Sequence, residues 1–216
     1  IIGGFEKVFE FARVFRNEGV STQHLQDFTM LEFYQAYSDY NDLMKSTEKM
    51  LSSAISKVLD ADTIQFGEHT IDLRVPWPRK TLQAAILEKT GIDIDQCPDI
   101  ETLQLAITAQ NIHLTYSGPA SRGKLIDELY KEYVRPHLIN PIFITDHPLD
   151  LSPLAKKQPK NKAKVQRFQL VIAGMEIVNA FSEVNDPIDQ QERFEEQTKD
   201  REAGDTEAHT MDKDYV

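Results

Sequence analysis

The sequence predicts an α+β domain in which an antiparallel sheet is flanked by helices and interrupted by a helical insertion. Two observations support this fold class. Short segments alternate apolar and polar residues with a period of two, as strands do, and longer segments place apolar residues three and four apart, as helices do. The strands are expected at 7–16, 28–36, 63–66, 69–73, 142–145, 168–173 and 176–181. The helices are expected near 39–59, 80–90, 99–110, 121–135 and 187–203. This order divides the chain into a strand-containing part at 1–77, a helical insertion at 78–140 and a return to the sheet at 141–216.

The first two strands are predicted to form an antiparallel pair. In 7–16, one face carries Val8, Glu10, Ala12, Val14 and Arg16. In 28–36, Met30, Glu32 and Tyr34 share a face. The connection between these strands is longer than a tight hairpin turn, and long loops in compact domains are often functional. We therefore expect the pair to carry a functional loop.

The elements that follow are separated by specific turn residues. Asp39 can cap the helix at 39–59, whose apolar residues recur at three- and four-residue spacings. Gly67 stands at the turn of the hairpin formed by 63–66 and 69–73, and Gly174 at the turn between the last two strands. Pro187 begins a polar helix that continues to about residue 203.

Composition narrows the class of protein. The chain has 216 residues, 40% hydrophobic and 27% charged, with 24 basic against 35 acidic residues and a net charge of −11. This acidity argues against nonspecific coating of nucleic acid. No apolar run reaches the roughly 18–20 residues of a membrane helix. The lone Cys97 cannot form an internal disulfide, which favours a reducing, cytoplasmic setting. The chain begins without Met, so we expect a fragment holding an incomplete domain.

Arg16, Glu18, Glu32 and Tyr34 form the first candidate site. Two antiparallel strands can bring the side chains of Arg16, Glu32 and Tyr34 to one cleft. A guanidinium suits a carboxylate or phosphate, while Glu and Tyr together can hold an ammonium group. An Arg–Glu pair across two strands on a solvated face is the simpler interpretation of the same residues.

Glu176, Asn179, Glu183 and Asn185 form the second candidate site. Asn179 and Glu183 share one parity along an extended segment that is flanked by apolar residues, where an unpaired carboxylate is costly. An edge strand with one solvent-exposed face explains the pattern equally well. The basic run from Lys156 to Arg167 could steer polyphosphate or RNA, but a solvated loop is the better default.

Five segments resemble the catalytic domain of class II lysyl-tRNA synthetases. They are FRNEG at 15–19, FTMLEFYQAY at 28–37, FITDHP at 143–148, SPLAK at 152–156 and EIVNAFSEVNDP at 176–187. The first two together resemble the second signature motif of class II enzymes. The resemblance implies that a dimer-forming first motif and an anticodon-binding barrel lie upstream, and that the third motif lies downstream.

The resemblance also implies a function. An enzyme of this family activates L-lysine with ATP, assisted by Mg²⁺, and transfers lysine to tRNA(Lys) as a homodimer with no membrane association. Two alternatives stay open: a related ligase that modifies a translation factor with a lysine-type group, and a non-catalytic synthetase-like binding module. We expect this chain alone to be inactive.

Residue roles follow from the same resemblance. Arg16 would bridge the lysine carboxylate and the α-phosphate. The other implied ATP contacts are Glu18, His24, Phe28 and Glu176, and the implied lysine pocket comprises Arg16, Glu32, Tyr34, Asn179 and Glu183.

This chain departs from the family pattern at two places. The family's His-Asn-Pro-Glu-Phe loop is replaced by His-Leu-Gln-Asp-Phe at 24–28. The usual magnesium carboxylates align with Gln169 and Glu176, so a neutral amide stands where one carboxylate is expected. Hard divalent cations prefer charged oxygen donors, and we therefore predict weaker metal binding.

Overall fold

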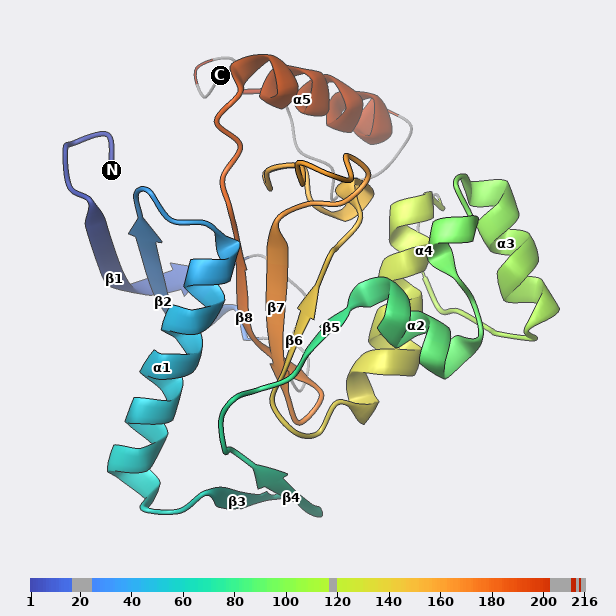
Figure 1. The fold of residues 1–216 in the computed structure, drawn as a ribbon. Helices are drawn as coiled ribbons and strands as arrows, with labels where there is room; N and C mark the ends of the chain where they lie inside the picture. The colour runs from blue at the N-terminus through green and yellow to red at the C-terminus, as the bar shows by residue number, and fades with distance from the viewer. Residues whose placement is uncertain (17–24, 117–119, 203–210, 213, 215–216) are drawn as a thin grey trace. The chain divides into compact units, whose positions relative to one another are not determined.

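A computed structural model describes residues 1–16, 25–116, 120–202, 211–212 and 214, and Figure 1 shows the course of the chain. The chain divides into two compact units, Ile1–Asp39 and Tyr40–Val216. No helix within the described residues is long and apolar enough to cross a membrane.

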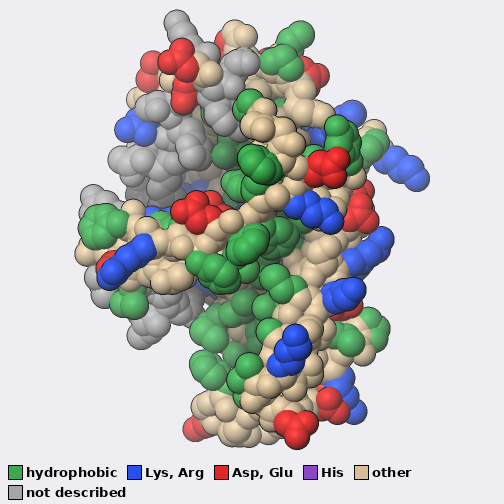
Figure 2. Space-filling model, turned by 90° about the vertical axis from the view of Figure 1, so that its left-hand side faces the viewer, with side chains coloured by type: hydrophobic (Ala, Val, Ile, Leu, Met, Phe, Trp, Pro, Cys, Tyr) green, Lys and Arg blue, Asp and Glu red, His purple; other side chains and the backbone are tan. Residues whose placement is uncertain are grey.

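The first unit is an antiparallel strand pair, as predicted. β1 (Lys7–Phe15) and β2 (Asp27–Gln35) pair with Val14 opposite Phe28. The Arg16 amide N–H donates to the Gln26 carbonyl oxygen at 2.9 Å, which extends the ladder by one step. Large hydrophobic side chains of this unit remain 69–73% exposed, namely Phe5, Phe9, Phe11 and Phe15. Hydrophobic side chains also reach the surface on the side of the molecule shown in Figure 2.

The second unit is built on a four-stranded sheet with the order β5–β6–β7–β8. The strands are β5 (Arg79–Thr81), β6 (Ile142–Thr145), β7 (Arg167–Ile172) and β8 (Met175–Phe181). β5 runs parallel to β6, and the other two pairings are antiparallel. The sequence predicted three of these strands and missed β5.

Two hydrophobic clusters cover opposite faces of this sheet. On one face α1 (Tyr40–Leu59) packs Met44 against Phe143 and Phe168. On the other face, Ile144 and Val171 pack against apolar residues between Leu82 and Val134, which we call the helical segment. Because side chains alternate along a strand, neighbouring residues of β6 and β7 serve different clusters. The α+β class is therefore observed.

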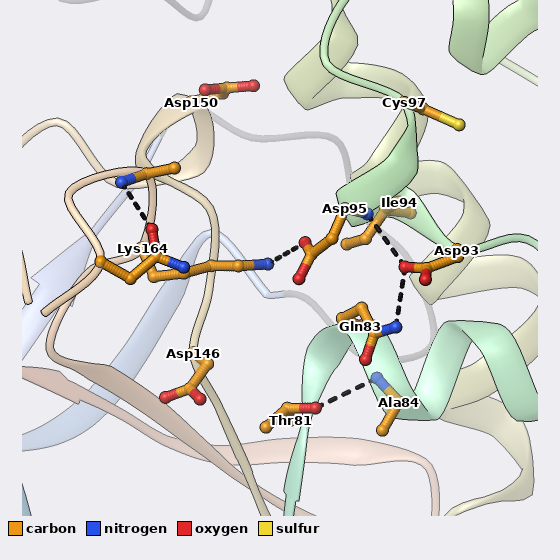
Figure 3. Close-up of polar contacts among 12 residues, drawn as sticks. Thr81, Gln83, Ala84, Asp93, Ile94, Asp95, Cys97, Asp146, Asp150 and Lys164 are labelled. Atoms are coloured by element: carbon orange, nitrogen blue, oxygen red, sulfur yellow. Dashed lines mark hydrogen bonds and ion pairs between the residues drawn. The ribbon is translucent and has the colours of Figure 1, made fainter.

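The helical segment contains α2 (Leu82–Thr90), α3 (Ile100–Ala109) and α4 (Arg122–Leu129). Thr81 caps α2, because its hydroxyl accepts a hydrogen bond from the Ala84 N–H at 3.1 Å (Figure 3). The helix predicted to continue to 135 changes geometry earlier, into a π-helical turn at Tyr130–Val134. Such turns inside helices are frequent at functional sites.

The remaining elements agree with those predicted from the sequence. β3 (Thr63–Phe66) and β4 (His69–Asp72) form a separate hairpin. Gly67 has φ of +58° at its turn, a conformation that glycine adopts without steric cost. The last helix is α5 (Pro187–Glu202).

Residues 146–166, which we call the strap, connect β6 to β7 and contain most of the basic run. The solvated-loop interpretation is wrong for two of its lysines. Lys164 is buried and forms an ion pair with Asp95 of the helical segment (Figure 3). Lys157 Nζ lies 2.7 Å from Asp189 Oδ1 on α5. Lys160 and Lys162 are exposed, as expected.

Because of Asp189, the free energy of unfolding of the second unit is expected to vary with pH in the acidic range. Hydrogen bonds from Arg193 and Lys157 lower the pKa of Asp189 from 3.8 to about 2. A lowered folded-state pKa stabilises the fold above the unfolded-state value, and this contribution is lost as pH falls through the folded-state value. We expect Asp189→Asn to reduce the free energy of unfolding at pH 7 by about 1–3 kcal/mol.

Urea denaturation from pH 7 to pH 2 checks this. The difference between the unchanged chain and Asp189→Asn should shrink between about pH 4 and pH 2. Asp42→Asn is the control, because the Lys45–Asp42 pair is exposed and such pairs contribute little. A pH-independent difference for Asp189→Asn would contradict the assignment.

Candidate functional site

One face of the β1–β2 pair carries all the described candidate residues of the first unit. Directly opposed residues share a face, and the ladder opposes Val14 with Phe28, Glu10 with Glu32, and Val8 with Tyr34. Arg16 continues this parity at the end nearest the connection between the strands. Its guanidinium carbon lies 5.7 Å from the centroid of the Phe28 ring, a cation–π distance. The structure therefore places Arg16, Phe28, Glu32 and Tyr34 on one face.

The register excludes the simpler interpretation of Arg16 and Glu32 as a direct cross-strand pair. Glu32 lies six residues along β2 from Gln26, which is paired with Arg16. Six residues span roughly 20 Å of strand. Glu32 instead lies directly opposite Glu10, and like charges in that arrangement repel each other. The face is thus cationic near Arg16 and anionic near Glu32.

The second group of candidates lies on β7 and β8. Gln169 is directly opposite Asn179, and Val171 is opposite Glu176. The register shifts between Leu170 and Val171, so Ile177 has no partner in the ladder and its side chain is 45% exposed. This β-bulge turns Glu176 toward the same face as Asn179, although a spacing of three would separate them in a regular strand. Nothing in the sequence indicated this bulge.

Gln169 connects two polar side chains on this face. Its amide nitrogen donates a hydrogen bond to Glu176 Oε2, and its oxygen lies 3.4 Å from His147 Nε2. Burial lowers the pKa of His147 to about 3, which keeps the imidazole neutral at pH 7. Glu176 retains surface exposure as a residue, but desolvation of its carboxyl group raises its pKa, against the opposing effect of Arg167 and Arg135.

Two residues of this face were missed by sequence reasoning. Arg167 was counted only in the basic run, although it has the same strand parity as Gln169. Its Nε donates to Asn179 Oδ1 at 2.9 Å. Tyr130 comes from the π-helical turn, and its buried hydroxyl has no hydrogen-bond partner among the described residues. Burial, and secondarily the charge of Glu176, raises the pKa of Tyr130.

Glu183 is the remaining described candidate residue for which the resemblance implies a role. Glu183 follows β8, pairs with Ala155 of the strap through an isolated bridge, and has its pKa raised by desolvation. Glu18 and His24 lie outside the described residues.

The residues around Glu176 do not form a metal site by themselves. Among the described residues, no group of three or more His, Cys, Asp or Glu side chains is arranged to hold a metal ion. Gln169 turns its amide nitrogen, a donor, toward Glu176. A donor in that place cannot coordinate a cation, and Mg²⁺ favours carboxylate oxygens. This donor set does not fit a magnesium site built from protein side chains alone.

Comparison with known proteins decides the family. The chain matches the family described as tRNA synthetases class II (D, K and N) over residues 1–216. It belongs to the class II tRNA synthetases. The resemblance recognised from the five segments is thereby confirmed.

This class II synthetase chain is also similar to curated proteins named lysine–tRNA ligase. It is 48% identical to those of Roseiflexus sp. (strain RS-1) and Chloroflexus aurantiacus (strain ATCC 29366 / DSM 635 / J-10-fl) over 216 residues, which is 100% of this chain and 44% of each relative. It is 47% identical to that of Bacillus subtilis (strain 168), with 43% of the relative covered. The chain thus spans less than half the length of these relatives.

Proposed function

We propose that this chain is part of the catalytic domain of a lysine–tRNA ligase. Such an enzyme activates L-lysine with ATP to lysyl-adenylate and transfers lysine to tRNA(Lys). The observation that carries the proposal is the order of charges on the β1–β2 face, with Arg16 at one end and Glu32 beside Tyr34 at the other. The similarity to proteins named lysine–tRNA ligase across the entire chain supports the same assignment.

The charge order suits an extended lysine. In adenylation the lysine carboxylate attacks the α-phosphate of ATP, so alignment and neutralisation of negative charge supply most of the rate acceleration. In our proposal Arg16 bridges the carboxylate and the α-phosphate. Glu32 and Tyr34 accept the ε-ammonium at the other end of the face. The separation of roughly 20 Å between the two ends leaves space for the reach of both side chains and of the substrate.

The other proposed contacts complete the two substrate sites. Phe28 stacks on adenine, and Glu18 and His24 contact the nucleotide. Asn179 and Glu183 are also proposed to contact lysine, and Glu176 to contact the nucleotide. An uncharged analogue of lysine would leave acceptors in this pocket unpaired, which supports discrimination between amino acids.

The remaining proposals concern the whole protein. We infer that it is cytoplasmic and homodimeric, that it is longer than this chain, and that residues 78–140 are an insertion into the class II sheet. The lengths of the relatives support the inference that the protein is longer than this chain, since this chain covers only 43–44% of each relative.

Lysine-dependent exchange of pyrophosphate into ATP tests the proposed function. The full-length protein should catalyse exchange with L-lysine and should charge tRNA(Lys). Exchange without charging of tRNA favours the ligase that modifies a translation factor. Absence of exchange at saturating L-lysine and ATP would refute the proposal and favour a binding module, an interpretation that Gln169 also supports because it replaces a carboxylate.

Gln169 leads to a prediction about magnesium. We propose that a magnesium ion is held by Glu176 together with the triphosphate, and less tightly than with a second carboxylate. Gln169→Glu is expected to lower the Mg²⁺ concentration needed for half-maximal exchange. The same change should tighten Mn²⁺ binding measured directly by electron paramagnetic resonance in the presence of ATP. Unchanged titrations in both assays would contradict this account.

A further inference from the structure

The tip of the strap, residues 158–164, is a turn with a well-bonded backbone. The Gln158 N–H donates to the Lys164 carbonyl oxygen at 2.9 Å, and the Lys164 N–H donates to the Asn161 carbonyl oxygen at 3.1 Å. Asn161 Oδ1 also accepts a hydrogen bond from the Ala163 N–H at 3.1 Å, a contact with which asparagine stabilises turns. The strap tip therefore has one defined conformation in this structure.

Two side chains anchor the strap tip to the second unit. Lys164 is buried and forms its ion pair with Asp95 of the helical segment (Figure 3). The Gln158 amide nitrogen donates to Asp146 Oδ1 at 2.7 Å. Because both ends of the turn are held in this way, the residues between them occupy a fixed place on the surface of the second unit.

Lys160 and Lys162 are the two cations of the strap tip that the fold does not use. Both are exposed. Within the part of the chain that the structure describes, neither ammonium group makes an ion pair or a hydrogen bond. The neighbouring Lys157 and Lys164, by contrast, each pair with an aspartate. Two uncompensated positive charges therefore lie two residues apart on an anchored turn.

The charge around the strap tip is opposite to that of the chain as a whole. The chain has a net charge of −11, which disfavours general attraction of polyanions. Residues 151–175 nevertheless contain no Asp or Glu. The backbone of the tip is also ordered before any partner binds, so association costs little further ordering of the backbone. A local, preformed surface for an anionic partner is the result.

We propose that the strap tip binds the sugar–phosphate backbone of tRNA through Lys160 and Lys162. Lysine binds phosphate as a point charge, and two residues of chain span at most about 7 Å, so both ammonium groups can reach phosphates of one strand. The inference rests on the proposed function and assigns a surface to its RNA partner. Contacts of this kind position the RNA and carry no sequence information.

The salt dependence of tRNA binding tests this surface. The dissociation constant of the full-length protein for fluorescently labelled tRNA(Lys) is measured by anisotropy between about 0.05 and 0.3 M salt. Each phosphate contact adds about 0.7–0.9 to the slope of log Kd against log salt concentration. The double variant Lys160→Ala/Lys162→Ala should therefore lower this slope by about 1.4–1.8 and weaken binding roughly 25- to 60-fold at about 0.1 M salt.

Two further double variants are the controls. Lys160→Arg/Lys162→Arg retains both charges and should retain the slope. Lys49→Ala/Lys57→Ala removes two exposed lysines of α1, so it changes the net charge equally and should leave the slope unchanged. All three double variants should unfold at the temperature of the unchanged protein, because none removes a side-chain contact among the described residues.

The expected loss has a second signature. Because phosphates are the same in every RNA, Lys160→Ala/Lys162→Ala should weaken tRNA(Lys) and a tRNA of another specificity by the same factor. An unchanged slope in this variant would overturn the inference. An equal loss in Lys49→Ala/Lys57→Ala, or a loss confined to tRNA(Lys), would also overturn it.

Failure of this inference is distinguishable from failure of the proposed function. If the unchanged protein lacked lysine-dependent exchange and did not charge tRNA(Lys), the proposed function would be refuted and the inference with it. If the unchanged protein charged tRNA(Lys) and Lys160→Ala/Lys162→Ala kept its salt slope, only the inference would be refuted.

Discussion

Arg16→Ala is expected to lower kcat/KM for lysine-dependent exchange by roughly 1,000-fold in the full-length protein. The guanidinium is proposed to hold the attacking carboxylate against the α-phosphate while negative charge develops, so its removal destroys both alignment and neutralisation. The loss should appear mainly in kcat, because the interaction is strongest in the transition state. Steady-state exchange at varied L-lysine and ATP measures both parameters.

Arg13→Ala is the matched control for Arg16. Arg13 lies on the same strand with the opposite parity and pairs with Asp27 at 2.9 Å through a side chain that is 82% exposed. Removing such a surface pair has little effect on stability. Exchange by Arg13→Ala should therefore match the unchanged protein. Comparable losses in both variants would show that the strand pair, rather than the Arg16 guanidinium, had been damaged.

Glu183→Gln is expected to raise the KM for L-lysine roughly 100-fold while leaving the KM for ATP unchanged. The carboxylate is proposed to pair with the ε-ammonium, and loss of a charged partner in a desolvated site costs several kcal/mol. Glu192→Gln, which removes the same charge from an exposed position on α5, is the control for general electrostatic steering. Equal KM values for L-lysine in Glu183→Gln and Glu192→Gln would contradict the role of Glu183.

The same residue predicts a pH dependence. Desolvation raises the pKa of Glu183, so its protonated form appears at a higher pH than for an exposed glutamate. Protonation removes the charge that attracts the ammonium. The KM for L-lysine should therefore rise as pH falls from neutrality toward the raised pKa, and Glu183→Gln should lack this dependence. The measurement is KM for L-lysine between pH 5 and pH 8 at fixed Mg²⁺ and ATP.

Local patterns in the sequence predicted most of the regular elements. β1 and β2 were found within one residue at each end because alternation of apolar and polar side chains directly reflects a two-residue period. β5 was missed because it is three residues long, Arg-Lys-Thr, and has no apolar alternation. Its strand character comes from parallel pairing with β6, which is distant in sequence.

The arrangement of the second candidate site, on β7 and β8, was only partly predictable, because it too depends on pairing between strands. Glu176 and Asn179 share a face because the pairing of β7 with β8 shifts by one residue, and a register shift is a property of two strands together. Arg167 was recognised only as one of six basic residues, although its strand parity matches that of Gln169. Lys164 was expected to be solvated as part of the basic run. It is buried instead, because it pairs with Asp95 from a distant part of the chain.

A crystal structure of the full-length protein with L-lysine and a non-hydrolysable ATP analogue tests the central claim most directly. The account predicts that Arg16 lies between the lysine carboxylate and the α-phosphate, with the ε-ammonium beside Glu32 and Tyr34. An Arg16 side chain directed into solvent, or lysine bound away from the β1–β2 face, would contradict it.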